Sequence, residues 1–159
     1  MNFKRLFSLS LLVLFACSIN AKPDSTKINK RRVLLVSSSL AAVLGGAYLY
    51  VENAWWSNKQ IPFHFDDGAD LTYALNVDKV GHFMGGLEAA DFFSSSMKWV
   101  GMNERKSLWY GAAFGSGLQL AIEMKDAYAP YWGFSKWDLI IGSTGSFWPV
   151  AQYYNTDLK

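Results

Sequence analysis

Apolar positions recur with helical spacing over the second half of the chain. Residues 79–100, 104–124 and 137–154 each carry apolar side chains in this pattern, and short polar breaks separate them. Such spacing predicts helices, and no stretch of strand length alternates between apolar and polar positions. Pro149 lacks a backbone donor, so we expect the third helix to bend or break near it. The pattern therefore predicts an all-α protein.

A fourth apolar stretch, residues 33–51, precedes these helices. It contains no charged residue and is bounded by Arg32 and Glu52. Its length can just span a bilayer, and the tryptophans at 55 and 56 suit a membrane interface. Its serines and glycines suit a buried helix packed against neighbours equally well. With this segment, the sequence predicts a compact bundle of about four hydrophobic helices, with 33–51 a candidate transmembrane or membrane-anchoring helix.

The first 21 residues have the pattern of an export signal, with a basic start followed by an apolar run. Ala21 suits an ordinary cleavage site, whereas "LFAC" ending at Cys17 resembles a bacterial lipobox, so lipidation of Cys17 remains an alternative. Cys17 is the only cysteine, so no internal disulfide forms. We expect a signal segment at 1–21, a basic linker at 22–32 and a single helical domain at 33–159.

Composition and charge favour a membrane-associated protein of the bacterial cell envelope. Half of the residues are hydrophobic and only 18% are charged, against about 25% in typical soluble domains. The 22–32 linker is basic and the remainder of the mature chain is acidic, which argues against nucleic acid as a partner. Basic flanks prefer the cytoplasm, so an exported linker favours the periplasmic or outer-membrane side over the inner membrane. Membrane lipid is the expected partner, and protein partners stay open.

Small residues recur four positions apart in two predicted helices. Gly81 is followed by Gly85, and Gly111 by Gly115. This spacing lets helix backbones approach closely. Because each glycine otherwise costs a helix about 1 kcal/mol relative to alanine, we expect close helix packing at both pairs.

"DKVGHFMGG", residues 78–86, begins the first of these helices with three polar side chains. Asp78 precedes the helical pattern, so we interpret it as a helix cap. His82 lies four positions later on the same face, whereas Lys79 lies off that face and is expected to reach solvent.

Two further polar clusters follow. Glu123 and Asp126 lie three residues apart at a helix end, where the helix dipole disfavours negative charge. Ser135 is placed to cap the last helix, and Asp138 lies three residues inside it, in an arrangement like a capping box.

Together, His82, Glu123, Asp126 and Asp138 offer one imidazole and three carboxylates. Three interpretations stay open: a buried structural network, a ligand-binding pocket, and a site for metal or acid–base chemistry on a lipid or cell-wall component. The donor set suits a divalent metal such as zinc, manganese or iron. Because no activated nucleophile is recognisable in the sequence, a non-enzymatic protein is favoured, and no cofactor is assigned.

The order of the clusters resembles the YfiM-like family, a domain of unknown function described as predicted periplasmic lipoproteins. "DKVGHF", "GSGLQLAIEMKDAY" and "WGFSKWD" carry the resemblance, which covers about residues 45–152. The layout is more distantly similar to VanZ-like membrane proteins. The resemblance implies an α-helical envelope protein and no particular reaction. It places the characteristic polar residues of the family on Asp78, Lys79, His82, Glu123, Asp126, Ser135 and Asp138.

Two positions depart from this family pattern. Ala127 stands where a glycine usually follows the second acid, and Gly142 stands where an asparagine usually follows Asp138. The second departure removes a polar partner, so we expect it to weaken any site.

Overall fold

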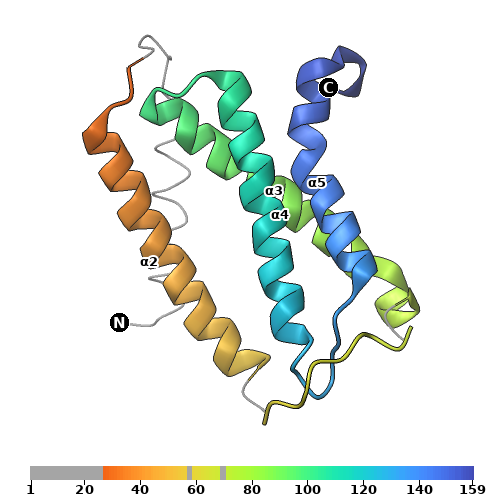
Figure 1. Cartoon of the computed structure of the whole chain (residues 1–159). Helices are drawn as coiled ribbons and strands as arrows, with labels where there is room; N and C mark the ends of the chain where they lie inside the picture. The colour runs from red at the N-terminus through yellow and green to blue at the C-terminus, as the bar shows by residue number, and fades with distance from the viewer. Residues whose placement is uncertain (1–26, 57–58, 69–70) are drawn as a thin grey trace.

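The fold is described for residues 27–56, 59–68 and 71–159 by a computed structural model. These residues form four α-helices and no β-strand, so the all-α prediction is confirmed (Figure 1). The predicted signal segment, Cys17 and the first residues of the linker lie outside the described residues. The helices are α2 (Lys30–Ala54), α3 (Val77–Val100), α4 (Glu104–Asp126) and α5 (Lys136–Tyr154), with short 3-10 helices at Tyr73–Asn76 and Thr156–Leu158.

Local chemistry sets the ends of the helices. α3 ends at Gly101, whose φ of 106° suits glycine, and the N–H groups of Gly101 and Met102 satisfy carbonyls of the last turn. α5 begins after Ser135, whose hydroxyl accepts a hydrogen bond from the Asp138 N–H at 3.1 Å. The helix continues through Pro149, so a break there is wrong, and the alternative of a bend stays a prediction. Proline lacks one donor, and the packing of α5 against α3 and α4 offsets that loss.

Glycines let α3, α4 and α5 pack closely. A Cβ on Gly86 would overlap the Gly142 carbonyl of α5, and one on Gly115 would lie 2.6 Å from the Ser146 hydroxyl. Gly111 likewise faces the backbone of α3. The predicted close approach is confirmed for Gly111 and Gly115. It is wrong for Gly81, which has nothing within 4 Å, and for Gly85, where a Cβ would meet only the Gln119 side chain at 3.5 Å. The face of α3 that meets its neighbours carries Gly86, not Gly81.

Few large apolar residues are buried in the centre of the bundle, and many lie on its outside. The buried apolar residues of the three helices are Ala90, Val100, Leu108, Ala112 and Val150. Large exposed apolar side chains on the same helices include Val80, Met84, Phe92, Trp109, Leu120, Trp137, Ile140 and Phe147. A water-soluble bundle buries its large apolar side chains, whereas membrane helices pack on small ones.

Helix α2 lies beside the bundle and contacts it at both ends. The Arg32 guanidinium donates to the Trp99 carbonyl at 2.8 Å, and the Lys125 ammonium lies 2.6 Å from the Glu52 carboxylate. No residue of α2 is buried, so the interpretation as a buried helix is wrong. Within the described chain, α2 is the one helix long and apolar enough to cross a membrane.

Candidate functional site

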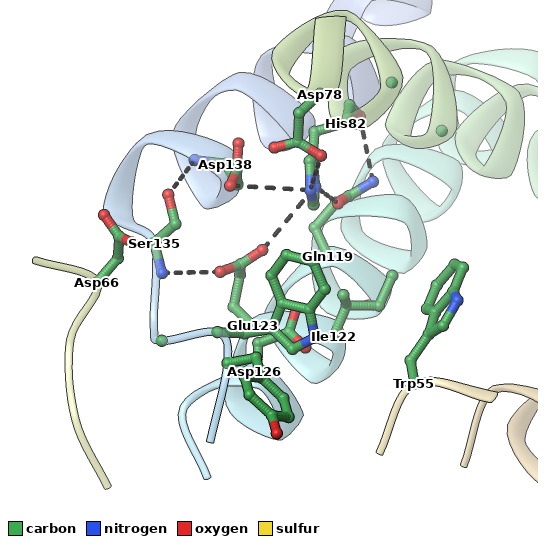
Figure 2. A pocket seen from close by; sticks show the side chains of 15 residues that line it. Trp55, Asp66, Asp78, His82, Gln119, Ile122, Glu123, Asp126, Ser135 and Asp138 are labelled. Carbon is green, nitrogen blue, oxygen red and sulfur yellow. Dashed lines mark hydrogen bonds and ion pairs between the residues drawn. The ribbon is translucent and has the colours of Figure 1, made fainter. Parts of the chain in front are cut away.

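The polar residues of the three clusters converge at one end of the bundle. The start of α3, the end of α4 and the start of α5 meet there, at the lower end of Figure 1. They surround a cavity of about 560 Å³. Figure 2 shows the polar side chains pointing into this end pocket. It is lined by Trp55, Asp66, Asp78, Gly81, His82, Gly85, Gln119, Ile122, Glu123, Asp126, Tyr131, Trp132, Gly133, Ser135 and Asp138.

The extended segment that carries His64 and Asp66 runs along the loop between α4 and α5. Together they close one side of the pocket. The His64 N–H donates to the Ala127 carbonyl at 3.0 Å, and the Phe134 N–H donates to the His64 carbonyl at 3.0 Å. The Asp66 N–H donates to the Phe134 carbonyl at 3.1 Å. These backbone bonds fix the loop that carries Tyr131, Trp132 and Ser135 into the pocket.

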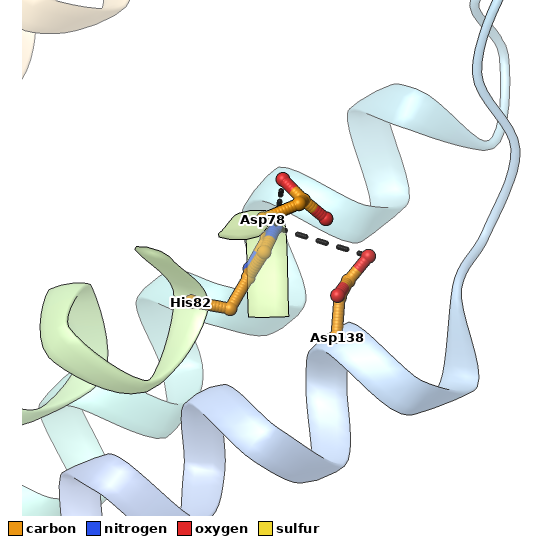
Figure 3. Close-up of side chains that lie close together, drawn as sticks. All are labelled: Asp78, His82 and Asp138. Carbon is orange, nitrogen blue, oxygen red and sulfur yellow. Dashed lines mark ion pairs between the residues drawn. The ribbon is translucent and has the colours of Figure 1, made fainter. Parts of the chain in front are cut away.

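His82 is held in a defined orientation by Gln119. The Gln119 amide nitrogen donates to the His82 backbone carbonyl at 3.2 Å, so its amide oxygen faces the ring. That oxygen lies 2.9 Å from His82 Nδ1 and can only accept, so Nδ1 carries a proton. In the neutral ring Nε2 then keeps its lone pair. Nε2 faces two carboxylates, at 3.8 Å from Asp78 and 3.8 Å from Asp138 (Figure 3).

Lys79 joins the same two carboxylates from the other side. Its ammonium lies 2.7 Å from Asp138 Oδ1 and 3.3 Å from Asp78 Oδ2. Lys79 is only 8% exposed, so the prediction that it reaches solvent is wrong. The helix also begins before Asp78, with Asn76 in the cap position, so the interpretation of Asp78 as the cap is wrong too. Its carboxylate contacts side chains instead.

Glu123 supports the start of α5 from the end of α4. Its Oε2 accepts the Ser135 N–H at 2.8 Å, which is the bond that the acid of a capping box would make. The Asp138 carboxylate is thereby left to face Lys79 and His82. The negative charge of Glu123 is unfavourable at the C-terminus of α4 but favourable at the N-terminus of α5. The contact with α5 therefore offsets the conflict with the α4 dipole that the sequence predicts.

Burial disfavours the charged forms of Glu123 and Asp126, the two acids at the end of α4. Burial raises the pKa of the Glu123 carboxyl to about 7, although the Ser135 N–H and His82 act in the opposite direction. Burial also raises the pKa of Asp126, and a hydrogen bond from Trp56 Nε1 at 2.6 Å opposes that rise. The other Glu123 oxygen lies 3.9 Å from His82 Nδ1.

The structure regroups the four expected site residues. In the described chain, the set of possible metal-ligating atoms within 4.8 Å of one another comes from Asp78, His82 and Asp138. Glu123 and Asp126 line the same pocket but are not in that set. Asp78, which its sequence position favours as a cap, joins the set instead.

Gln119 is a pocket residue that the sequence pattern did not single out. It is 3% exposed and lies four residues before Glu123, so a polar side chain on the same helix face was the available signal. A Cβ on Gly142 would lie 2.6 Å from the Gln119 side chain. Gln119 therefore fills the space beside Gly142 and supplies a polar partner to His82. Ala127 has φ of −56°, so alanine fits that departure without strain.

The electrostatic character of the pocket is acidic. Asp66, Asp78, Glu123, Asp126 and Asp138 line it, and no lysine or arginine is among the described lining residues. Lys79 offsets part of this charge from beneath. Trp55, Ile122, Tyr131 and Trp132 make the remaining walls apolar.

Fold and site together define an all-helical protein with an acidic pocket at one end of a tightly packed bundle. The chain belongs to DUF2279, a family described as predicted periplasmic lipoproteins, whose model matches residues 64–154. The match covers α3, α4 and α5 and every polar pocket residue from Asp66 to Asp138. No curated protein and no solved structure matches the chain. The family description agrees with the expected location on the periplasmic side of the cell envelope.

Proposed function

We propose that this protein is a membrane-associated envelope protein that binds the headgroup of an amphiphilic ligand in its end pocket. One observation carries the proposal: a cavity of about 560 Å³ has a polar floor at His82, Gln119 and Asp138 and apolar aromatic walls. Pockets that combine apolar walls with a few convergent polar groups are the usual form of ligand sites.

Membrane association is supported by the distribution of large apolar side chains. Many of them lie on the outside of the bundle, while its centre holds mainly alanine, serine and glycine with a few larger residues such as Leu108 and Val150. Helix α2 adds a long apolar surface with no buried residue. We propose that the 33–51 part of α2 anchors the domain, and that 1–21 is a signal segment with Cys17 available for lipidation. The YfiM-like and VanZ-like resemblances support the same location.

The acidic lining favours a headgroup that donates hydrogen bonds. Carboxylates accept hydrogen bonds and repel anions, and charge-assisted bonds are the stronger ones. A primary ammonium can donate to several carboxylates at once, whereas a quaternary ammonium has no N–H to donate. We therefore assign the pocket to amphiphiles with a primary ammonium headgroup.

Binding of short-chain lipids tests this assignment. Full-length protein in detergent with EDTA is titrated by calorimetry with dihexanoyl phosphatidylethanolamine, phosphatidylcholine or phosphatidylglycerol. We expect the ethanolamine lipid to bind at least about 10-fold more tightly than the other two, and Asp138→Asn to weaken it by about 10-fold. Asp91→Asn, an exposed acid elsewhere on α3, is the matched control. Equal binding of all three lipids, or unchanged binding by Asp138→Asn, would contradict the proposal.

Membrane association has a separate test. Cells expressing the full chain and a Cys17→Ser variant are fractionated and the membranes are washed with sodium carbonate. We expect both proteins to remain in the membrane pellet because α2 and the bundle surface hold them there. Release of both proteins into the supernatant would contradict this part.

Acid–base chemistry on the bound amphiphile is a second candidate function. It is favoured by the imidazole of His82 and the carboxylate of Glu123 lying 3.9 Å apart at the pocket floor. Such a pair suits activation of water toward an ester bond. The test measures the release of hexanoate from the dihexanoyl lipids. Release by the wild type that is lost in His82→Gln would support this candidate, and no release from any of the lipids would count against it.

A further inference from the structure

We propose that Asp78, His82 and Asp138 form a binding site for a divalent transition metal, with His82 Nε2 and one oxygen of each carboxylate as ligands. This set differs from the His82, Glu123, Asp126 and Asp138 set that the sequence suggests. The inference rests on the proposed function, because it adds a divalent cation to the same pocket and shares His82 and Asp138 with it. It has its own test.

The first argument for a metal site is the spacing of the three ligand atoms. His82 Nε2 lies 3.8 Å from Asp78 Oδ1 and 3.8 Å from Asp138 Oδ2, and the three atoms lie within 4.8 Å of one another. A direct hydrogen bond needs about 2.7–3.2 Å, so neither pair is directly bonded. Two ligands of one tetrahedral zinc lie roughly 3.4 Å apart, given bonds of about 2.1 Å. Small inward movements therefore bring all three atoms to one cation (Figure 3).

The second argument is the orientation of each ligand. Gln119 holds Nδ1 through a hydrogen bond of 2.9 Å, which leaves the lone pair of Nε2 toward the carboxylates. Histidines that bind metals usually have their other nitrogen fixed in this way. Lys79 holds the far oxygens, Asp138 Oδ1 and Asp78 Oδ2, and leaves the near oxygens toward His82. Both partners thus hold the three ligand atoms toward one point.

The third argument is that a cation can reach the site from the pocket and that the donor types suit a transition metal. Asp78, His82 and Asp138 all line the end pocket, so a cation can enter from it and keep coordination positions open to water or a ligand. One imidazole with two carboxylates suits zinc or manganese, and soft thiolate-binding metals are disfavoured. The acidic lining adds a favourable long-range attraction for a dication.

Metal titration of matched variants tests the site. Full-length protein, purified in detergent with a tag that lacks histidine, is stripped with EDTA, dialysed and titrated with zinc chloride or manganese chloride. Bound metal is counted by elemental analysis, and affinity is measured by calorimetry. The variants are His82→Gln, Asp138→Asn, Gln119→Met and Asp126→Asn, and circular dichroism verifies the fold of each.

We expect one metal per chain in the wild type, a loss of more than about 100-fold in affinity for His82→Gln and Asp138→Asn, and a loss of about 10–100-fold for Gln119→Met. Asp126→Asn, which changes only the acidic lining, should lose far less affinity than Asp138→Asn does. Substoichiometric metal in the wild type, or full binding by a folded Asp138→Asn, would overturn the site. Equal losses in Asp126→Asn and Asp138→Asn would overturn it in favour of the set suggested by the sequence. No lipid is present in this titration, and the lipid titration is carried out in EDTA, so each proposal fails separately.

Discussion

The middle of the α3–α5 bundle and its pocket end bury groups of opposite kinds. In the middle, glycines such as Gly86 and Gly115 bring backbones into contact and leave no space for a side chain of their own. At the pocket end, charged side chains such as Lys79 and Asp138 are buried around a cavity. Close packing needs no charge, so the polar end is costly for stability alone. The comparison indicates that the middle holds the fold, and it supports the proposal that the pocket end binds a ligand.

Removal of Lys79 should have the largest effect at the pocket end. Lys79→Met leaves the Asp138 carboxylate, 4% exposed, without its ammonium partner at 2.7 Å. We expect the free energy of unfolding to fall by about 3–5 kcal/mol, measured by chemical denaturation in detergent. Lys98→Met, in the last turn of the same helix, is the control and should change stability little. Equal stability of the two variants would mean that the pocket charges are not coupled.

Protonation of Glu123 should make stability fall as pH rises. Its pKa is about 7 in the folded protein and 4.5 as the ordinary value, so the folded state holds the proton more tightly. The stabilisation from that proton is fully present below about pH 4.5 and is lost as pH rises to about 7, on the order of 3 kcal/mol.

Glu123→Gln should flatten this dependence, because the amide keeps an acceptor for the Ser135 N–H and does not titrate. Denaturation curves between pH 4.5 and 8 provide the measurement, with the exposed Glu88→Gln on α3 as control. An unchanged pH slope in Glu123→Gln would show that another group is responsible.

A methyl group in the packed middle should be poorly tolerated. Gly86→Ala places a Cβ against the Gly142 carbonyl, and we expect a loss of about 1–3 kcal/mol. Gly117→Ala on α4 has nothing within 4 Å and should stabilise its helix by up to about 1 kcal/mol. Thermal denaturation compares the two. If both alanines act alike, close packing is not what holds the middle together.

The attachment of α2 should contribute least. The Glu52–Lys125 pair is half-exposed at the end of α2, and exposed ion pairs contribute about 0.2–1 kcal/mol. Glu52→Gln should therefore lower the free energy of unfolding by less than about 1 kcal/mol in denaturation experiments. A larger loss would make α2 an integral part of the bundle.

Much of the fold could be predicted from local sequence. Residues 104–124 were expected as a helix and α4 spans Glu104–Asp126, because helical periodicity depends only on neighbouring positions. The contacts across helices could not be predicted. Lys79 is buried and Gly86 rather than Gly81 meets α5, because the angles at which the helices cross decide which face is covered.

The candidate site was predicted in part for the same reason. His82, Glu123 and Asp138 were singled out by residue type, and they do line one pocket. The apolar pattern starts at residue 79, two residues after the true start of α3 at Val77, so it favours a cap at Asp78. Gln119 lies within the helix predicted at 104–124, and its type alone does not mark it as a site residue. The role of Asp78 depends on where α3 begins, and the partner of Gln119 lies on another helix. Neither can be read from neighbouring residues in the sequence.

The most direct test of the account is the state of the His82 ring. The chain has two histidines, so ¹⁵N-histidine labelling of a His64→Gln variant reports His82 alone. We predict that nitrogen NMR finds the proton of the neutral ring on Nδ1, and that the Nε2 signal shifts on addition of zinc chloride. A proton on Nε2, with no change on addition of zinc or of dihexanoyl phosphatidylethanolamine, would contradict the claim that the pocket end is a binding site.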